Sequence, residues 1–309
     1  MPPLISDQIT PMCVGIDLGG SKLRGAIATG DGHIMVELTE KTNLSGGKKV
    51  LEQIVRMVQE LEAKSELKAE RIGVGSPGVM DAAGRFQLSF NIDGLAEFSL
   101  AEELEKVLGV TVIVENDVNM AALGEQRYGA GRGCRDFVVL SIGTGLGMGL
   151  LINGQLHRGA RGFAGEIAYL PLGTDPRDPR SRRVGALESA AGTHGILQRF
   201  HTLGGSAKDV YEVFKASVSG DPIAQIVVEE ESHLIATAIL AICTVVDPEL
   251  VIMTGGIGSD PVLIDLVVAR VKDISPHDIV IARSELGDRA GVVGAVAAAQ
   301  IDAHAKYQN

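Results

Sequence analysis

Residues 14–28 read VGIDLGGSKLRGAIA, which is an apolar run, a glycine turn and a second apolar run. This pattern predicts a β-hairpin, and the Gly-Asp-Gly turn at 30–32 then leads into a third strand over 34–38. The same order returns at 137–157, where FVVLSIGTGLGMGLLI is followed by an Asn-Gly turn and a short strand. The sequence therefore predicts an internal duplication, with two similar lobes.

Helices and buried strands account for the rest of the chain. Hydrophobic periodicity predicts helices at 50–61, 100–108, 118–127, 187–200, 207–218, 222–246, 262–271 and 292–304. Short apolar runs predict buried strands at 72–75, 110–114 and 250–254. Hairpins combined with βα units favour an α/β fold in which helices pack on mixed sheets.

The composition is that of a globular protein. The chain has 309 residues, a hydrophobic fraction of 45% and a formal net charge of −11, which excludes disorder over most of its length and disfavours nucleic-acid binding. Residues 1–10 lack the basic and apolar regions of a signal peptide, and the longest apolar run, 234–246, is too short for a bilayer. Three widely spaced cysteines, Cys13, Cys134 and Cys243, are typical of a reducing compartment. We expect a soluble, cytoplasmic protein.

Both glycine turns are of a kind that binds phosphate, because glycines let several backbone N–H groups approach an anion closely. A dinucleotide-binding fingerprint would open a helix, whereas GTGLGMG at 143–149 runs into a strand. A P-loop would need Lys before Ser or Thr and then a helix, whereas 20–22 reads Gly-Ser-Lys. A simple tight hairpin is the alternative for either turn taken alone.

Several acidic side chains lie at the ends of predicted elements. Asp17 precedes the first glycine turn, where a carboxylate can hold Mg²⁺ beside a triphosphate or can cap the turn. Asn116 and Asp117 stand between a strand and a helix, where N-capping is the alternative role. Glu166 follows a glycine-rich run and Glu188 opens a helix; by themselves both are typical of a solvated surface.

Taken together, these segments resemble the ROK family, the repressor, open reading frame and kinase group of the actin-like ATPase superfamily. The resemblance extends from Val14 to about Ala299. Its motifs are DLGGSK at 17–22, GSPG at 75–78, END at 115–117, AALGE at 121–125, GTGLGMG at 143–149, AGE at 164–166, LES at 187–189 and TGGIG at 254–258.

The resemblance implies two ribonuclease-H-like lobes with mixed sheets and an active-site cleft between them, where ATP and a sugar bind. The small N-terminal lobe would comprise 1–118 and about 292–309, and the larger C-terminal lobe 119–291. Asp117 would be the general base facing the sugar hydroxyl. The sugar-binding residues would be Ser76 with its Ser76-Pro77-Gly78 turn, Asn91, Asn116, Asp117, Glu166, Tyr169 and Glu188.

The resemblance also implies a nucleotide site formed by the glycine turns. The residues facing the phosphates and metal would be Asp17, Gly19, Gly20, Ser21 and Lys22, with Gly143, Thr144 and Gly145 from the second lobe. Gly255 and Gly256 would pass beside the adenosine. Asp17 would hold Mg²⁺ through water.

The sequence departs from the family at its zinc motif, which has the form C-x-C-G-x-x-G-C-L-E with a histidine from E-x-G-H. Residues 178–186 read DPRSRRVGA, without cysteine, and Tyr169 stands where the histidine would be. We therefore expect no zinc site, and the sugar preference that depends on this histidine stays open.

The resemblance and the residues together predict a glucokinase-like enzyme that phosphorylates a hexose hydroxyl with ATP and Mg²⁺. The family's repressors carry an N-terminal winged helix-turn-helix, for which residues 1–12 are too few. The alternatives are a non-catalytic sugar-binding protein or a kinase for fructose, mannose, or an N-acetylated or amino sugar. Polyphosphate is an alternative donor. We expect no nucleic-acid or membrane partner, and a homodimer is compatible with this interpretation.

Overall fold

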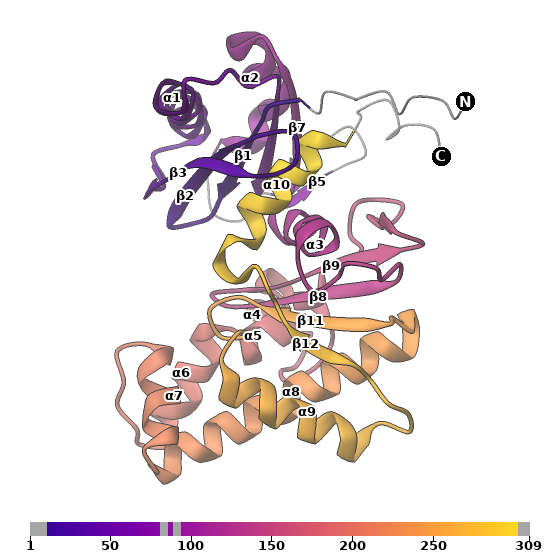
Figure 1. Ribbon diagram of the computed structural model, residues 1–309. Coiled ribbons are helices and arrows are strands. Elements are labelled where there is room, and N and C mark those ends of the chain that lie inside the picture. The colour runs from indigo at the N-terminus through magenta and orange to yellow at the C-terminus, as the bar shows by residue number, and fades with distance from the viewer. Residues whose placement is uncertain (1–10, 81–85, 89–93, 302–309) are drawn as a thin grey trace, which may run out of the picture. The chain divides into compact units, whose positions relative to one another are not determined.

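The structure is a computed structural model that describes residues 11–80, 86–88 and 94–301. This part of the chain contains both helices and strands (Figure 1). None of the helices within these residues is both long enough and apolar enough to cross a membrane.

The chain divides into two compact units, each an α/β structure with one five-stranded mixed sheet. Unit 1 comprises residues 1–127 with 289–309, and unit 2 comprises residues 128–288. The sequence analysis places the change of lobe after residue 118. In the structure the helix that follows stays with unit 1, because its Gly124 packs closely on the chain near residue 290.

The sheet of unit 1 begins with the predicted hairpin. Its strand order is β3-β2-β1-β4-β7, with β1 to β3 antiparallel and with β4 and β7 parallel to β1. The strands of unit 1, including a small separate pair, are β1 (Cys13–Leu18), β2 (Lys22–Ala28), β3 (Ile34–Lys41), β4 (Arg71–Ser76), β5 (Val79–Met80), β6 (Phe86–Leu88) and β7 (Thr111–Asn116). Its helices are α1 (Gly47–Ser65), η1 (Leu95–Glu97), α2 (Leu100–Leu108), α3 (Asp117–Tyr128) and α10 (Ala290–Gln300).

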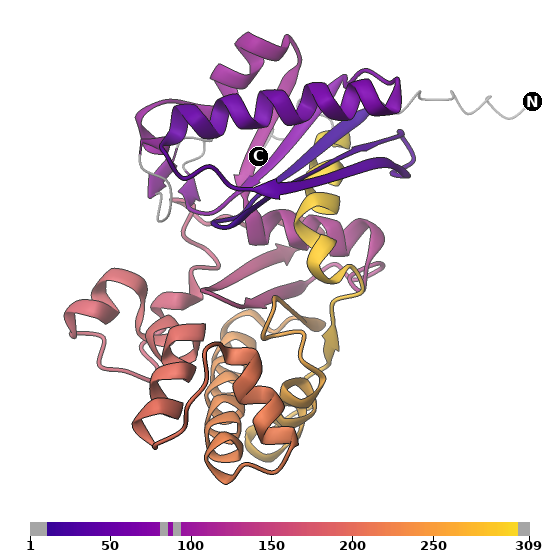
Figure 2. The same cartoon turned by 90° about the vertical axis from the view of Figure 1, so that its left-hand side faces the viewer.

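Two helices cover opposite faces of this sheet, α1 on one side and α10 on the other (Figure 2). Alternate residues of a strand face opposite sides, so Ile16 packs in the apolar cluster with α1 while Gly15 faces α10. A Cβ at Gly15 would lie 2.5 Å from the carbonyl oxygen of Val292, and one at Gly73 would run into the backbone of Ala295. Close packing of α10 therefore depends on glycine in β1 and β4.

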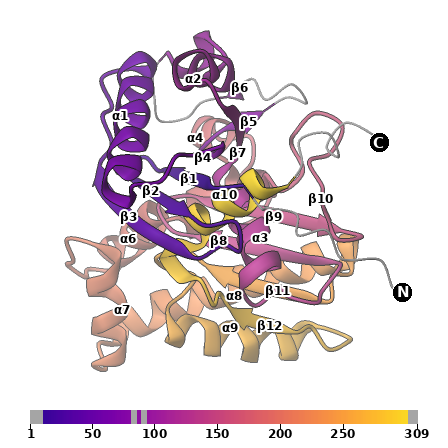
Figure 3. The same ribbon diagram turned by 45° about the horizontal axis from the view of Figure 1, so that its top comes forward.

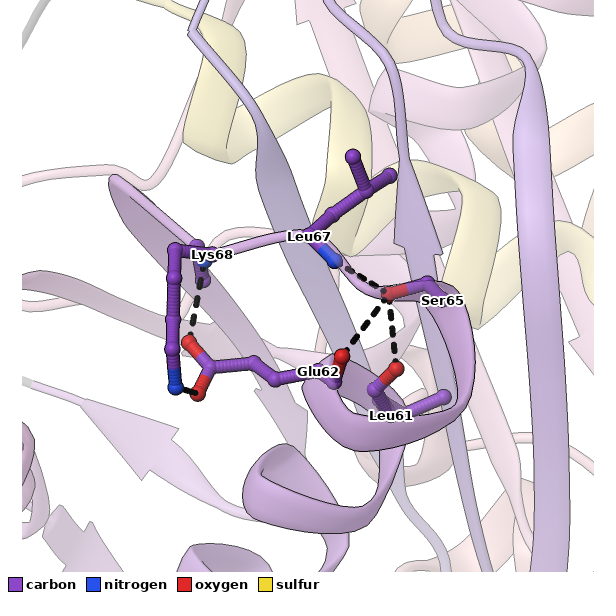
Figure 4. A network of polar contacts seen from close by, with 6 residues as sticks. Leu61, Glu62, Ser65, Leu67 and Lys68 are labelled. Carbon is purple, nitrogen blue, oxygen red and sulfur yellow. Dashed lines mark hydrogen bonds and ion pairs between the residues drawn. The ribbon is translucent and has the colours of Figure 1, made fainter.

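Side chains at the end of α1 direct the chain into β4 (Figure 4). The Ser65 hydroxyl donates to the carbonyl of Leu61 at 2.8 Å and accepts from the amide of Leu67 at 3.3 Å. Glu62 pairs with the Lys68 ammonium at 2.6 Å and accepts from the amide of Ala69 at 3.0 Å. Two of these contacts bind the amides of Leu67 and Ala69, just beyond the helix, and so hold the chain where it leaves α1.

The sheet of unit 2 repeats this topology, in the order β10-β9-β8-β11-β12. Its strands are β8 (Phe137–Ile142), β9 (Leu146–Ile152), β10 (Gln155–Leu156), β11 (Leu250–Thr254) and β12 (Ile281–Arg283). Its helices are η2 (Ile167–Tyr169), α4 (Pro179–Val184), α5 (Ala186–Ala191), α6 (Thr193–Thr202), α7 (Val210–Val218), α8 (Pro222–Val246) and α9 (Pro261–Ile274), followed by η3 (Gly287–Arg289) at the unit boundary. Within unit 2, α8 and α9 pack side by side (Figure 3). The repeated strand order confirms the internal duplication.

Some predicted elements differ from those observed. The helix predicted over 187–200 is two helices, because the chain leaves helical geometry at Gly192, whose φ and ψ are −73° and 164°. The helix predicted over 207–218 begins at Val210, where Asp209 is the N-cap. The sequence analysis missed β12, which has only three residues. The end predicted for the last helix, at residue 304, lies outside the described residues.

The apolar core of unit 2 contains a buried ion pair between α6 and α8. Glu231 is fully buried, and its Oε2 lies 2.5 Å from Nη2 of Arg199. Arg199 also donates from Nη1 to the carbonyl of Ala190, at the end of α5. Burial raises the pKa of Glu231 to about 7, although the Arg199 charge favours the ionised form.

We predict that Glu231 makes the stability of the protein pH-dependent. Unfolded Glu231 releases its proton near its ordinary pKa of 4.5, whereas folded Glu231 keeps it to about pH 7. The folded state therefore binds more protons in this window, and the free energy of unfolding falls as pH rises through it. Glu231→Gln should remove this part of the pH dependence, on the order of 3 kcal/mol, when urea unfolding is compared at pH 5 and pH 8.

The control is Glu230→Gln, since Glu230 lies 3.7 Å from Arg199 but its side chain is about half exposed. This variant should keep the wild-type difference between the two pH values. Equal pH dependence in wild type and Glu231→Gln would contradict the prediction.

Candidate functional site

In unit 1 the predicted site residues lie at one edge of the sheet. Strands β1, β4 and β7 are parallel, so their carboxyl ends meet there, as in other α/β sheets that bind ligands. Asp17 is opposite Gly75 in β4, and the next residue of β4, Ser76, is opposite Asn116 in β7. Asp117 follows as the first residue of α3. The topology therefore brings together Asp17, Ser76, Asn116 and Asp117.

Asn116 caps the N-terminus of α3. The sequence analysis left this role open between Asn116 and Asp117. Its Oδ1 accepts hydrogen bonds from the amides of Val118 and Asn119, at 2.9 and 3.1 Å. Its Nδ2 donates to the carbonyl of Gly78 at 3.2 Å and so ties the capped helix to the Ser76-Pro77-Gly78 turn. Both ends of the Asn116 amide are thus used in holding the start of α3.

Asp117 projects from this capped end. Its Oδ1 accepts from the amide of Val118 at 2.9 Å. Burial of the carboxyl raises the pKa of Asp117, and the backbone hydrogen bonds oppose that shift. A carboxylate with a raised pKa is a stronger proton acceptor than an exposed one.

Two neighbours complete this edge of unit 1. Ser76 is fully buried, and its hydroxyl has no hydrogen-bond partner in the described part of the chain. Buried Glu115 accepts from the amide of Asn116 at 3.0 Å and from the side chain of Asn119 at 3.1 Å, which fixes the turn into α3. The predicted sugar ligand Asn91 lies outside the described residues.

Asp17 lies against the first turn of α10. A Cβ at Gly291 would lie 2.7 Å from Oδ2 and 2.9 Å from Oδ1 of Asp17, so the absence of a side chain makes room for the carboxylate. The partial positive charge of a helix N-terminus stabilises an anion at this place. Mg²⁺ is commonly bound by one or two carboxylates together with water and phosphate oxygens, and the Asp17 carboxylate is of the type that such a site uses.

The first glycine turn, 19–22, is held at its base and exposed at its tip. Thr42 donates through Oγ1 to the carbonyl of Gly19 at 2.7 Å and through its amide to the carbonyl of Ser21 at 3.1 Å. Gly20, Ser21 and Lys22 are exposed. The turn is therefore fixed in position while its tip can reach an anion.

In unit 2 the second glycine turn is fixed by two helices. The carbonyl of Gly143 accepts from both the amide and the hydroxyl of Thr193, the first residue of α6, at 3.2 and 3.0 Å. Glu188 of α5 accepts through Oε2 from the amide of Leu146 at 2.9 Å, and a Cβ at Gly145 would lie 2.6 Å from that oxygen. The structure thus places Glu188 directly against the turn predicted to bind phosphate.

The third glycine turn, after β11, lies beside the second. The amides of Ile257 and Gly258 both donate to the carbonyl of Ile142 at 3.0 Å. Gly255 has a φ of +88°, and a Cβ there would meet the backbone of Ile142. Because β8 and β11 are parallel neighbours, these turns share the carboxyl edge of the sheet of unit 2.

The predicted sugar-side residues of unit 2 gather near Tyr169. Burial and then the negative charges of Glu166 and Glu188 raise the pKa of the Tyr169 phenol. The phenol donates to the carbonyl of Arg183 at 3.2 Å. Burial raises the pKa of Glu188, while the Leu146 amide and the Arg180 charge oppose that shift.

Hydroxyl groups hold the segment in which the sequence analysis expects no zinc site. Oγ1 of Thr174 donates to the carbonyl of Ala186 at 2.9 Å and lies 2.8 Å from Oγ of buried Ser181. Asp178 caps α4 by accepting from the amide of Arg180 at 2.8 Å. Within the described residues, no group of three His, Cys, Asp or Glu side chains is arranged to hold a metal ion.

The sequence analysis missed the contacts of Thr193 and the clasp, by which we mean the hydrogen bonds of the Thr174 hydroxyl with Ser181 and with the carbonyl of Ala186. Thr193 is the first residue of α6, but the N-cap is Gly192 and no side chain caps this helix. The bond of Thr193 to a strand-end glycine fifty residues earlier is not visible in any local pattern. The same holds for Thr174 and Ser181.

Comparisons with known proteins agree over nearly the whole chain. The family model described as ROK family matches residues 13–301. The glucokinase of Thermotoga maritima is 30% identical over 91% of this chain and 95% of its own. The bifunctional enzyme NanE/NanK of Brucella suis is 31% identical over 91% of this chain and 52% of its own.

A solved structure shares the fold. It is a ROK family glucokinase from Streptomyces griseus in complex with glucose and AMPPNP, 26% identical, with a TM-score of 0.75 over 94% of this chain and 99% of that one. The matched regions include both sheets and all the glycine turns described above. The chain belongs to the ROK family.

Proposed function

We propose that this ROK-family sugar kinase transfers the γ-phosphoryl group of ATP to a hydroxyl of a hexose, glucose or a close relative. The observation that carries the proposal is Asp117, which projects from a helix capped by Asn116, with its pKa raised by burial. The Streptomyces griseus relative, which holds glucose and AMPPNP, supports a sugar and a nucleoside triphosphate as the two ligands.

Asp117 is proposed as the general base. As the sugar hydroxyl oxygen attacks the γ-phosphorus, the O–H proton passes to the Asp117 carboxylate, the bond from phosphorus to the β,γ-bridging oxygen breaks, and ADP leaves. A raised pKa brings a carboxyl closer to the working pH, where a base accepts protons most effectively. Phosphoryl transfer otherwise needs mainly positioning and neutralisation of charge.

The glycine turns are proposed to hold the nucleotide. In unit 1 the residues toward the phosphates are Gly19, Gly20, Ser21 and Lys22; in unit 2 they are Gly143, Thr144 and Gly145, with Gly255 and Gly256 beside the adenosine. Backbone N–H groups would bind phosphate oxygens, and the Lys22 ammonium would add positive charge. Asp17 would hold Mg²⁺ through water, and the bound ion would neutralise part of the triphosphate charge.

Each unit has residues that we propose for sugar binding. Unit 1 would supply Ser76, Asn116 and Asp117, and the buried Ser76 hydroxyl without a partner in the described residues fits a ligand contact. Unit 2 would supply Glu166, Tyr169 and Glu188. Since one oxygen of Glu188 is bonded to Leu146, Oε1 is the oxygen proposed for a sugar hydroxyl.

The family does not by itself identify the sugar, because the names of the relatives state different functions. They include glucokinases, NanE/NanK and a β-glucoside kinase. A coupled assay of ADP release with Mg²⁺, over glucose, mannose, fructose, N-acetylmannosamine and glucosamine, tests the proposal. Glucose should give the highest kcat/KM. ADP release with none of these sugars would contradict a hexose kinase and favour a non-catalytic sugar-binding protein.

Asp117→Asn should lower kcat by about 10²- to 10⁴-fold, the usual contribution of general acid–base catalysis. Sugar affinity should stay near that of the wild type, because Asn keeps the size and the hydrogen-bonding atoms of Asp. Steady-state kinetics and calorimetry measure the two quantities. Asp265→Asn, on the exposed face of α9, is the control. Turnover at the wild-type rate in Asp117→Asn would reduce Asp117 to a structural residue.

Asp17→Asn should raise the Mg²⁺ concentration needed for half-maximal activity by about tenfold or more, since one charge-assisted contact contributes about 1.5 to 3 kcal/mol. The isosteric change keeps the contact with Gly291 and the start of α10. Sugar binding without nucleotide should be unaffected in calorimetry. An unchanged Mg²⁺ titration would refute the assignment of Asp17 to the metal.

Removal of zinc should leave the protein active. The clasp formed by Thr174, Ser181 and Ala186 orders the segment through hydroxyl groups, so no metal is needed to hold it. After dialysis against a chelator and return of Mg²⁺, the melting temperature and kcat should equal those of the untreated protein. Elemental analysis that finds about one zinc per chain, lost together with activity, would show that the expectation is wrong.

A further inference from the structure

Tyr211 is an aromatic residue whose exposure has no explanation in the packing of unit 2. It lies in the first turn of α7 and is 62% exposed, although α7 packs against α6 and α8 (Figure 1). Exposed tyrosines scattered over a surface are common and need no function. Tyr211 differs because its hydroxyl end touches a glycine turn.

The contact is with Gly256, in the turn after β11. A Cβ at Gly256 would lie 2.5 Å from the hydroxyl oxygen of Tyr211, so the phenol reaches the Cα of this glycine. The turn at Gly143 lies next to Gly256, since a Cβ at Gly143 would lie 3.7 Å from the amide nitrogen of Gly256. The tip of Tyr211 therefore lies at Gly256, beside the point where the two turns on the carboxyl edge of the sheet approach each other.

The start of α7 holds the phenol in this place. Oδ1 of Asp209 accepts from the amide of Glu212 at 3.0 Å, and Oε2 of Glu212 accepts from the amide of Lys208 at 2.9 Å. These two bonds form a variant of the capping box, which fixes the first helical turn. The backbone at Tyr211 is thus fixed, its hydroxyl lies against Gly256, and most of its surface stays open to solvent.

An aromatic ring with a fixed backbone and a solvent-exposed face is suited to stacking on a flat ligand. Nucleobases stack on tyrosine rings whatever their hydrogen-bonding groups, because every base has a π-face. Glycines without side chains, next to the ring, leave room for the ribose and phosphates to follow the turns.

We propose that Tyr211 is a nucleotide-binding residue whose ring packs on the adenine base of ATP. This inference rests on the proposed function, in which ATP is the phosphoryl donor and Gly255 and Gly256 lie beside the adenosine. It adds a residue from α7 to that site and predicts that α7 distinguishes a nucleotide from a donor that lacks a base.

The test compares wild type with Tyr211→Ala, Tyr211→Phe and Val218→Ala. Calorimetry gives the Kd for ADP and for inorganic tripolyphosphate, and the coupled assay gives the KM for ATP. Tyr211→Ala should raise both the Kd for ADP and the KM for ATP by about tenfold, which is within the range for loss of one stacking contact with a base. Tripolyphosphate affinity and the KM for the sugar should not change, since neither ligand has a base.

The other two variants distinguish the effect of the aromatic ring from the effects of the hydroxyl group and of other exposed residues of α7. Tyr211→Phe keeps the ring and should bind ADP within about threefold of wild type, since a lost neutral hydrogen bond contributes only modestly. Val218 is 69% exposed at the far end of α7, so Val218→Ala should behave as wild type in every measurement. Because both changed residues are exposed, circular dichroism should show the wild-type melting temperature throughout.

The outcomes separate the two claims. ADP affinity in Tyr211→Ala equal to that of wild type, while the wild type phosphorylates sugar with ATP, would overturn the role of Tyr211 and leave the proposed function standing. An equal loss for ADP and tripolyphosphate would also overturn it, because the effect would then lie in the turns. A wild type that transfers phosphate only from polyphosphate would overturn both.

Discussion

The close contact between α10 and the sheet of unit 1 determines where the chemistry of that unit can lie. The helix comes from the end of the chain, and it reaches β1 and β4 because Gly15 and Gly73 present no side chain to it. Its first turn then lies under the carboxylate of Asp17. A larger residue at Gly15 or Gly73 would push α10 away from the sheet. The N-terminus of α10, with its partial positive charge, would then lie farther from the Asp17 carboxylate.

The same logic of strand ends operates in both units. Each sheet has three antiparallel strands followed by two parallel ones, so each presents a carboxyl edge where loops can bind a ligand. In unit 1 this edge carries carboxylates, a capped helix and one glycine turn, whereas in unit 2 it carries two glycine turns. The duplication of the fold thus supplied two similar edges that now carry different residue types.

The sequence predicted the parts of this arrangement that depend on local pattern. Strand–glycine–strand repeats identified both sheets, and the same pattern predicted that Asp17 lies at the end of one strand and that Asp117 comes directly after another. What it missed depends on contacts between distant elements: Thr193 bonded to Gly143, Tyr211 against Gly256, and the break at Gly192. No local periodicity encodes such contacts, and the division of capping between Asn116 and Asp117 needed atomic positions.

A series of hydrogen bonds within unit 2 fixes the position of Glu188. Its helix, α5, is fixed at the start by the Thr174 hydroxyl on the carbonyl of Ala186, and at the end by Arg199 on the carbonyl of Ala190. Arg199 is held in turn by buried Glu231. Each bond is directional and each group is partly or fully buried, so the helix has little freedom to rotate. The position of Glu188 against the glycine turn therefore depends on the core of unit 2, and a change in the charge of Glu231 would reach it through a single arginine.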